Sequence, residues 1–502
     1  WLFERNEIAQ SFPYFLKADD LYGIARVLKV LNPKNMGIEN FLEMTSCIMT
    51  LDVMDLKPYP VVVARMAAIE YLKGNIDAMR ALSTIFFEWI DPGVLPVSPE
   101  EYCEYIWEAG WLVILDSDEA LPEREKDILA FTRHCDEYMP HLSDQDEARF
   151  SVFGFPSVLR GIRDHTRIVS TMEAFQERTI KSGEYPLRNE LFRLRGDLMR
   201  AEYYYEMEEF DKANEIIKQT MTKAEAGGFT HLYFICTALL VKLMRAEHKP
   251  NEIDALTARL ETMIVNKKEY FFLPNLHAFQ LRNRIISGEA ALSEVFEAEN
   301  SAYRDKPYFY LLYRHITLVR SLISTGNYNE AILILGNLDL LCRKYKRTMD
   351  LIEVNVLCSI AQYGLGHEET ACRHLLGALK EAKKYGLIRI FVDDAKGLWP
   401  VLDIVHKQMA GKYMRQIIIS CKKELTHAGY KLTKKKYAHL ELTKTEIKIL
   451  RALQAGMSYA EIAQDNNIRI STVKSRVHII YSKLEVNNKT SAVLAAQGMG
   501  IL

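Results

Sequence analysis

The chain is 502 residues long, enough for two or three domains with a large core, and its 49% hydrophobic and 26% charged residues are typical of a soluble globular protein. No apolar run approaches the roughly 18 residues needed to span a bilayer, and the eight scattered cysteines, with no C-x-x-C pair, argue against a zinc site or a disulfide framework and suit a reducing cytoplasm. The net charge of −2 is unevenly divided: residues 431–502 hold twelve Lys and Arg and five Asp and Glu, so a basic end of +7 follows a body of −9, which is typical of a polyanion-binding module on a scaffold.

Residues 1–428 are predicted to be an all-α scaffold. Apolar residues recur with a 3.6-residue period almost throughout, and several of the fifteen prolines fall in apparent connections, such as residues 56–58, 91–93 and 249–250. Helix pairs joined by short turns, repeated along a chain, predict an α-solenoid.

One turn pattern recurs in this scaffold, consisting of a helix, a tight turn and an alanine early in the next helix. It occurs at residues 326–331 and 366–371, and in related form at 208–213 and 74–78. The glycine allows the turn, and the alanine allows the paired helices to approach closely. These units are tetratricopeptide-like with irregular lengths, and four in one helical chain support a repeat array.

Three aromatic clusters lie along the array, and each has two readings. They could line a ligand-binding concave face, or they could pack helix pairs together, which we favour. The clusters are residues 203–205, 270–272, and 308–310 with Tyr313; the isolated histidines His134, His231 and His315 are interpreted as structural.

The array gives way to a basic connection. Residues 386–394 interrupt the helical rhythm after the last repeat, and residues 429–439 form a predicted linker that contains Lys431 and Lys434 to Lys436. Those lysines are either a tether that contacts DNA phosphates or a solvated linker, and the sequence favours neither reading.

Residues 440–502 are predicted to form a compact four-helix module. Thr443 with Glu446, and Ser458 with Glu461, are two capping boxes, each ahead of an apolar-periodic run. Gly456 stands where the first helix needs a left-handed residue to end. Residues 467–469 are predicted to form the turn before the third helix.

The third helix is predicted to be the DNA-reading element. Val473, Val477, Ile480 and Leu484 form one apolar stripe at helical spacing. The opposite face carries short or cationic side chains that could enter a major groove, namely Ser471, Lys474, Ser475, His478 and Ser482. A fourth helix over about 489–497 is small and apolar, so we expect its surface to be covered by a second copy of the chain.

This module resembles the LuxR-type helix-turn-helix of bacterial transcription regulators. The pattern is matched at Leu442, Thr443, Glu446, Ile449, Leu450, Gly456, Ser458, Glu461, Ile462, Ala463, Thr472, Val473, Lys474, Lys483, Leu484, Val486 and Ala492. Thr445 and Lys489 replace arginines of the family, Arg476 replaces a histidine, and Arg469 replaces the serine that caps the recognition helix. The resemblance implies that Lys474, Ser475 and His478 read bases, that Thr472, Arg476 and Lys489 lie nearer phosphates, and that Lys483 also belongs to the DNA-binding set.

The resemblance extends to the whole order of segments. A repeat array, a segment like 386–402 and a LuxR-type domain are together similar to the large ATP-dependent LuxR regulators related to the maltose-regulon activator, and residues 57–78 look like the first repeat of that family. Family members carry an N-terminal nucleotide-binding domain, but no Gly-x-x-x-x-Gly-Lys-[Ser/Thr] loop occurs in these 502 residues, so we expect no cofactor. No signal peptide is visible. Because the chain begins at Trp1 with no initiator methionine, we expect it to be a fragment or a processed product.

Two functions from different classes fit these patterns. The first is a cytoplasmic DNA-binding regulator, an activator by resemblance, whose array senses an unidentified effector and which binds double-stranded DNA and RNA polymerase as a homodimer or larger oligomer. The second is a repeat-protein scaffold whose C-terminal module docks protein; the +7 end and the Thr472-Val473-Lys474 pattern favour the first. The sequence contains no nucleophile–base set or metal-ligand spacing, so neither an enzyme nor a metal site is expected, and the module is not expected to contact a membrane.

Overall fold

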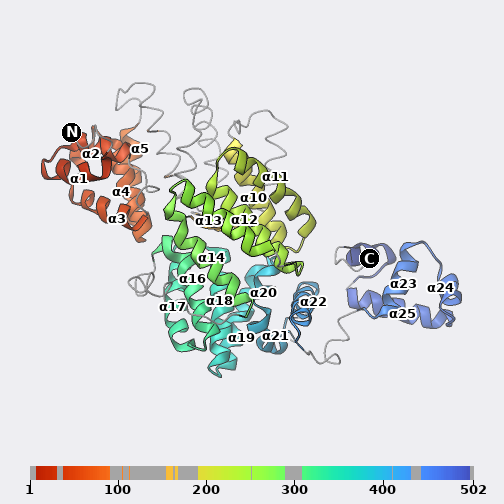
Figure 1. Ribbon diagram of the computed structural model, residues 1–502. Coiled ribbons are helices and arrows are strands. Elements are labelled where there is room, and N and C mark those ends of the chain that lie inside the picture. Colours follow the sequence, from red (N-terminus) through yellow and green to blue (C-terminus); the bar gives the residue numbers. More distant parts are fainter. Residues whose placement is uncertain are drawn as a thin grey trace. The chain divides into compact units, whose positions relative to one another are not determined.

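A computed structural model describes residues 7–30, 38–90, 105, 112, 154–161, 164–167, 190–249, 252–288, 308–406, 408–409, 411–430, 442–484, 486–497 and 502 (Figure 1). Within these ranges the regular elements are all helices and no strand is formed, which confirms the predicted all-α class. The chain divides into two compact units, Trp1–Leu357 and Cys358–Leu502. The domain boundaries predicted at 428 and 440 stay predictions.

The first unit opens with a small helical cluster. Its elements are α1 (Ile8–Lys17), α2 (Leu21–Val30), α3 (Ile38–Thr45), η2 (Ser46–Thr50), η3 (Val53–Leu56), α4 (Pro60–Lys73) and α5 (Ile76–Trp89). Helix α4 is buried along most of its length because α2 and α5 both pack on it. Its Tyr71 also meets the rings of Phe309 and Tyr345 edge-on, at centroid separations of 5.7 and 5.0 Å, so this cluster packs on the repeats that follow.

Paired helices then continue the first unit. They are α10 (Glu190–Glu206), α11 (Phe210–Ala226), α12 (Thr230–Ala246), α13 (Ile253–Asn266), η5 (Tyr270–Phe272), α14 (Leu273–Ile286), η6 (Phe309–Leu311), α16 (Leu312–Ser324), α17 (Tyr328–Lys344) and α18 (Thr348–Gly364). Successive helices of each pair pack against one another, as a solenoid requires. The helices α10, α12, α14, α16 and α18 alternate with α11, α13 and α17. We call them the inner helices, because a separate segment, residues 154–161 and 164–167, packs on this side of the array.

Left-handed residues end the repeat helices where the turn pattern predicts them. Gly326 and Gly366 have φ of +81° and +82°, and the alanine five residues after each is fully buried. In the turn at residues 74–79 the alanine prediction is wrong. Ala78 is exposed, and Met79, which lies five residues after Gly74, fills the buried position instead. The shorter spacing in that sequence moved the alanine one position out of register.

Four turns use residues other than glycine in the left-handed conformation. They are Glu208, His248, Lys268 and Lys346, with φ between +49° and +64°. Each helix still ends with a backbone hydrogen bond from the residue after this position to the carbonyl five residues earlier, as in Glu209 N to Tyr204 O at 2.9 Å. The hydrogen bond that ends each helix therefore forms even in turns that lack a glycine.

The second unit begins within α18 and continues through α19 (Glu368–Lys383), α20 (Arg389–Val392), α21 (Ala395–Val405) and α22 (Lys412–His427). The predicted interruption at 386–394 is the turn at Gly386 followed by the four-residue helix α20. Helices α20 and α21 both pack on α22, so the interruption is part of the compact second unit.

Most aromatic and histidine side chains singled out in the sequence are packing residues. Tyr205, Phe272 and Phe309 are buried, whereas Tyr270 is exposed. His231 and His315 are buried in the helical core. His134, Cys103, Cys135 and the lysines at 431 and 434–436 lie outside the described residues. The six described cysteines are free thiols, and no helix in the described ranges is long and apolar enough to cross a bilayer.

Candidate nucleic-acid interface

The C-terminal module is built from four helices, α23 (Lys444–Gln454), α24 (Tyr459–Asp465), α25 (Ile470–Leu484) and α26 (Lys489–Gln497) (Figure 1). They enclose a core of their own, made of small and branched apolar residues: Ile449, Leu450, Leu453, Ile462, Ala463, Val473, Val477, Ile480, Leu484, Ala492 and Ala496. A core shared by all four helices fixes the direction in which α25 presents its other face.

Both predicted capping boxes are formed. The amide of Glu446 donates to Thr443 Oγ1 at 3.2 Å, and the amide of Thr443 donates to Glu446 Oε2 at 2.6 Å. Ser458 and Glu461 repeat the arrangement at 3.3 and 2.7 Å. These bonds satisfy amides at the first turns of α23 and α24 and fix where each helix starts.

Glu446 has a second role that the sequence did not reveal. Lys483 Nζ, from the far end of α25, donates to both of its carboxylate oxygens at 3.1 and 2.8 Å. Burial acts to raise the pKa of Glu446, but the hydrogen bonds from Lys483 and Thr443 outweigh it and hold the pKa below its usual value. The pair therefore pins the start of α23 to the end of α25.

The turns between the helices set the angle of α25. Gly456 has φ of +88° after α23, as predicted. Asn467 has φ of +52° in the turn before α25, a conformation that asparagine tolerates better than most residues. The amides of Thr472 and Val473 then both donate to Arg469 O, so α25 begins directly after the predicted turn of 467–469.

Helix α25 divides into the two predicted faces. Val473, Val477, Ile480 and Leu484 are buried, which confirms the apolar stripe. Lys474, Ser475 and His478 are exposed on the opposite face, as are Ser471 and Ser482. An exposed row of hydroxyl, imidazole and ammonium groups on one helix presents the donors and acceptors that read base edges in a major groove.

Three of the other predicted site residues are less accessible. Thr472 and Arg476 are half-buried at the flanks of the exposed face. Lys483 is bound to Glu446, and its side chain is only 13% exposed. This geometry argues against the expectation that Lys483 contacts DNA, because moving the ammonium to a phosphate would leave a buried carboxylate without its cation.

Helix α26 is capped by Asn488, the residue that precedes it. The amide of Ser491 donates to Asn488 Oδ1 at 2.8 Å. Lys489 is exposed at the first turn. Ala492 and Ala496 are buried in the module's own core, so a second copy is not needed to cover them; the part of the helix left for such a contact is Leu494, whose side chain is 62% exposed.

Two exposed isoleucines on α25 were not predicted as site residues. Ile470 and Ile479 are 47% and 45% exposed and lie on the two flanks of the face that carries Lys474 and His478. Apolar side chains at such positions suit the C5-methyl group of thymine. Their one signal in the sequence is that neither fits the buried stripe.

Comparison with known proteins follows the same division of the chain. Residues 182–408 match a family model described as MalT-like TPR region, and residues 440–496 match one described as bacterial regulatory proteins, luxR family. The chain is also similar to the HTH-type transcriptional regulator MalT of Cronobacter sakazakii (strain ATCC BAA-894), with 23% identity over 335 residues, or 62% of this chain. That match spans 36% of the relative's length.

Proposed function

Because the chain joins a MalT-like TPR region to a luxR-family regulatory domain, we propose that it is a DNA-binding transcription regulator. The observation that carries the proposal is α25, which rests on its own module by one buried stripe and leaves Lys474, Ser475 and His478 free to enter a groove. In this role α25 lies in the major groove, as recognition helices of helix-turn-helix proteins do.

Specific contacts follow from the exposed groups. Lys474 donates to O6 and N7 of a guanine, Ser475 and His478 contact neighbouring bases, and Ile479 meets a thymine methyl group. Lys489 and the first turn of α26 approach a phosphate, because a helix N-terminus and an ammonium group both attract anions. Thr472 and Arg476 lie nearer the phosphates of the DNA backbone.

Each DNA site is proposed to bind two copies of the chain. One short recognition helix reads few base pairs, so we propose that a homodimer or larger oligomer reads two half-sites. Leu494 is the proposed contact between the two modules, as the exposed apolar residue of α26.

The repeat array is proposed to regulate the DNA-reading module. We propose that an effector binds the array and releases or assembles the DNA-reading modules, and that the bound protein recruits RNA polymerase as an activator in the cytoplasm. The resemblance to regulators of the maltose type supports activation. In this proposal the described residues catalyse no reaction and hold no cofactor.

The experiment is selection of duplexes from a random pool with the full chain, followed by titration of the selected duplex at several salt concentrations. We expect a recovered sequence motif and a logarithm of affinity that falls linearly with the logarithm of salt, because neutralised phosphates release counterions. If no motif is recovered and the salt dependence is flat, the alternative in which the module docks protein is favoured.

A further inference from the structure

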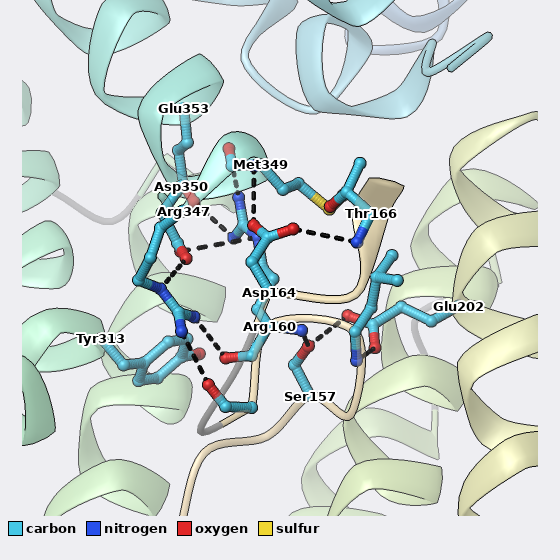
Figure 2. A network of polar contacts seen from close by, with 12 residues as sticks. Ser157, Arg160, Asp164, Thr166, Glu202, Tyr313, Arg347, Met349, Asp350 and Glu353 are labelled. Carbon is cyan, nitrogen blue, oxygen red and sulfur yellow. Dashed lines mark hydrogen bonds and ion pairs between the residues drawn. The ribbon is translucent and has the colours of Figure 1, made fainter. Parts of the chain in front are cut away.

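Residues 154–161 and 164–167 pack on the inner helices although they are not part of the repeats (Figure 2). Within the described part of this segment the backbone pairing is local: one isolated bridge joins Arg160 and Asp164, and the amide of His165 donates to Leu159 O at 2.9 Å. Buried main-chain amides and carbonyls need hydrogen-bond partners, and here the partners are side chains of the inner helices. We call these residues the strap.

Main-chain amides of the strap are bound by Glu202 of α10. Its carboxylate accepts from the amides of Val158 and Leu159 at 3.2 and 3.0 Å. It also accepts from Ser157 Oγ at 2.6 Å, and Ser157 Oγ in turn accepts from the amide of Arg160 at 2.8 Å. One buried carboxylate therefore organises a whole turn of the strap.

Main-chain carbonyls of the strap are bound by Arg347, just before α18. Its guanidinium donates to the carbonyl oxygens of Gly161 and Arg160 at 2.8 and 2.7 Å. Nε of the same guanidinium donates to Asp350 Oδ2 at 2.6 Å. In the first turn of α18, the amide of Met349 donates to Asp164 Oδ2 at 2.9 Å. Arg347 and the start of α18 therefore bind the strap at residues 160–161 and at Asp164.

One strap side chain enters the charged centre of the array. Arg160 Nη1 lies 2.5 Å from Glu353 Oε2, and Nη2 donates to Met349 O at 3.3 Å. Glu353 also accepts from Arg320 of α16 at 2.7 Å and from Arg282 of α14 at 3.3 Å. Burial acts to raise the pKa of Glu353, but the three arginines outweigh it and hold the pKa well below its usual value.

Apolar anchors complete the contact. Val158 and Leu159 are buried, and the ring of Phe155 meets Phe309 edge-on at a centroid separation of 5.9 Å. The carbonyl of Phe155 lies 2.8 Å from Nε2 of His231 on α12. A buried aromatic anchor, a buried aliphatic pair and a central arginine are the features of a tightly bound peptide.

Two of the buried charges that bind the strap keep a charged partner without it. If Arg160 leaves, Glu353 retains Arg282 and Arg320, and Arg347 retains Asp350. Glu202, in contrast, is buried and has its hydrogen-bond partners in the strap. Because a buried carboxylate without partners carries a large penalty, the site favours an occupant that supplies main-chain amides.

We propose that the inner helices α10, α12, α14, α16 and α18 form a peptide-binding site whose occupant is the chain's own residues 154–167. The site reads main-chain amides with Glu202, main-chain carbonyls with Arg347 and one arginine side chain with Glu353. It takes a peptide that folds into a turn and carries apolar residues just before an arginine. This inference rests on the polar network of Figure 2 and does not depend on DNA binding.

The test is binding of a fluorescently labelled synthetic peptide of residues 154–167 to the full chain, measured by anisotropy. In the chain, the double substitution Leu159→Asp and Arg160→Ala places a charge in a buried position and removes the central cation, which displaces the strap. We expect this variant to bind the peptide at least about tenfold more tightly than the unaltered chain, whose site is filled. A peptide carrying Arg160→Ala, and a chain carrying Glu353→Gln as well, should each bind at least about tenfold more weakly, as losing a charged hydrogen bond implies.

Equal binding to the unaltered and strap-displaced chains, or binding indifferent to Arg160 and Glu353, overturns the proposal. Hydrogen exchange on the single variant Arg160→Ala keeps the test decisive if the double variant does not fold. We expect faster exchange at Val158 and Leu159 with α10 to α14 still protected, whereas faster exchange throughout those helices would make the strap an integral part of the core. Arg373→Ala is the control, because Arg373 is an exposed arginine outside the network.

Discussion

Replacing Lys483 with alanine should destabilise the C-terminal module. Lys483 donates to both carboxylate oxygens of Glu446, and the two side chains are 13% and 7% exposed, so water screens the pair poorly. A hydrogen bond to a charged group contributes about 1.5–3 kcal/mol, and the loss of the cation from a buried carboxylate falls within that range. We expect Lys483→Ala to lower the free energy of unfolding by about 2 kcal/mol, equivalent to a fall of about 8–16 °C in Tm for a module of this size.

The assay is thermal unfolding of residues 440–502, followed by circular dichroism, with Lys448→Ala as the matched control. Lys448 also forms an ion pair between two helices, 3.1 Å from Asp465, but its side chain is 59% exposed and that of Asp465 is 50% exposed. Exposed pairs contribute about 0–1 kcal/mol, so the control should melt within a few degrees of the unaltered module.

Acid should remove the difference between the unaltered module and Lys483→Ala. The folded-state pKa of Glu446 is lowered, so its contribution to stability is complete above the unfolded-state value of about 4.3 and is lost as the pH falls through the folded-state pKa. We therefore expect the two melting curves to approach one another below about pH 4. If Lys483→Ala melts like the unaltered module at pH 7 but binds DNA more weakly, Lys483 contacts phosphate and the reasoning from its burial is refuted.

Three further predictions concern other parts of the chain. Glu353→Gln leaves buried arginines without their carboxylate, so native-state hydrogen exchange should show α18 opening about 3–5 kcal/mol more easily; unchanged exchange would show that the network adds no stability. Asn488→Ala removes the acceptor for the Ser491 amide, so the module should lose about 1 kcal/mol in thermal unfolding; a Tm that does not change would mean that water replaces the cap. Replacing the four lysines at 431 and 434–436 with alanine should flatten the salt dependence of DNA binding if they contact phosphates, and an unchanged slope would identify them as linker.

The DNA-reading module could be predicted from sequence because its determinants are local. The residues of each capping box lie three positions apart, and the stripe of Val473, Val477, Ile480 and Leu484 repeats with the period of the helix. Local patterns of this kind specify where a helix begins and which side is buried. They gave α26 its observed limits and α25 its observed faces.

Pairings between distant residues could not be predicted. Arg160 and Glu353 are separated by 193 positions, and nothing in either local sequence marks one as the partner of the other. The resemblance placed Lys483 in the DNA-binding set, but a lysine on a recognition helix is equally suited to a phosphate and to a carboxylate. Only the packing of α23 on α25 brings Glu446 within its reach. The turn at 208–213 was predicted, whereas no glycine marks the left-handed residues at Lys268 and Lys346.

The orientation of α25 on DNA is tested most directly by comparing Lys474→Ala with Lys489→Ala in the full chain. Each variant is titrated against the selected duplex and a scrambled duplex at two salt concentrations. A good base contact contributes about 1–3 kcal/mol at its base pair, so Lys474→Ala should weaken binding to the selected duplex about tenfold or more and leave the scrambled duplex nearly unchanged. Lys489→Ala should weaken both duplexes alike, as the loss of a phosphate contact does. If Lys474→Ala weakens both equally, Lys474 contacts the backbone and the proposed orientation of the recognition helix is wrong.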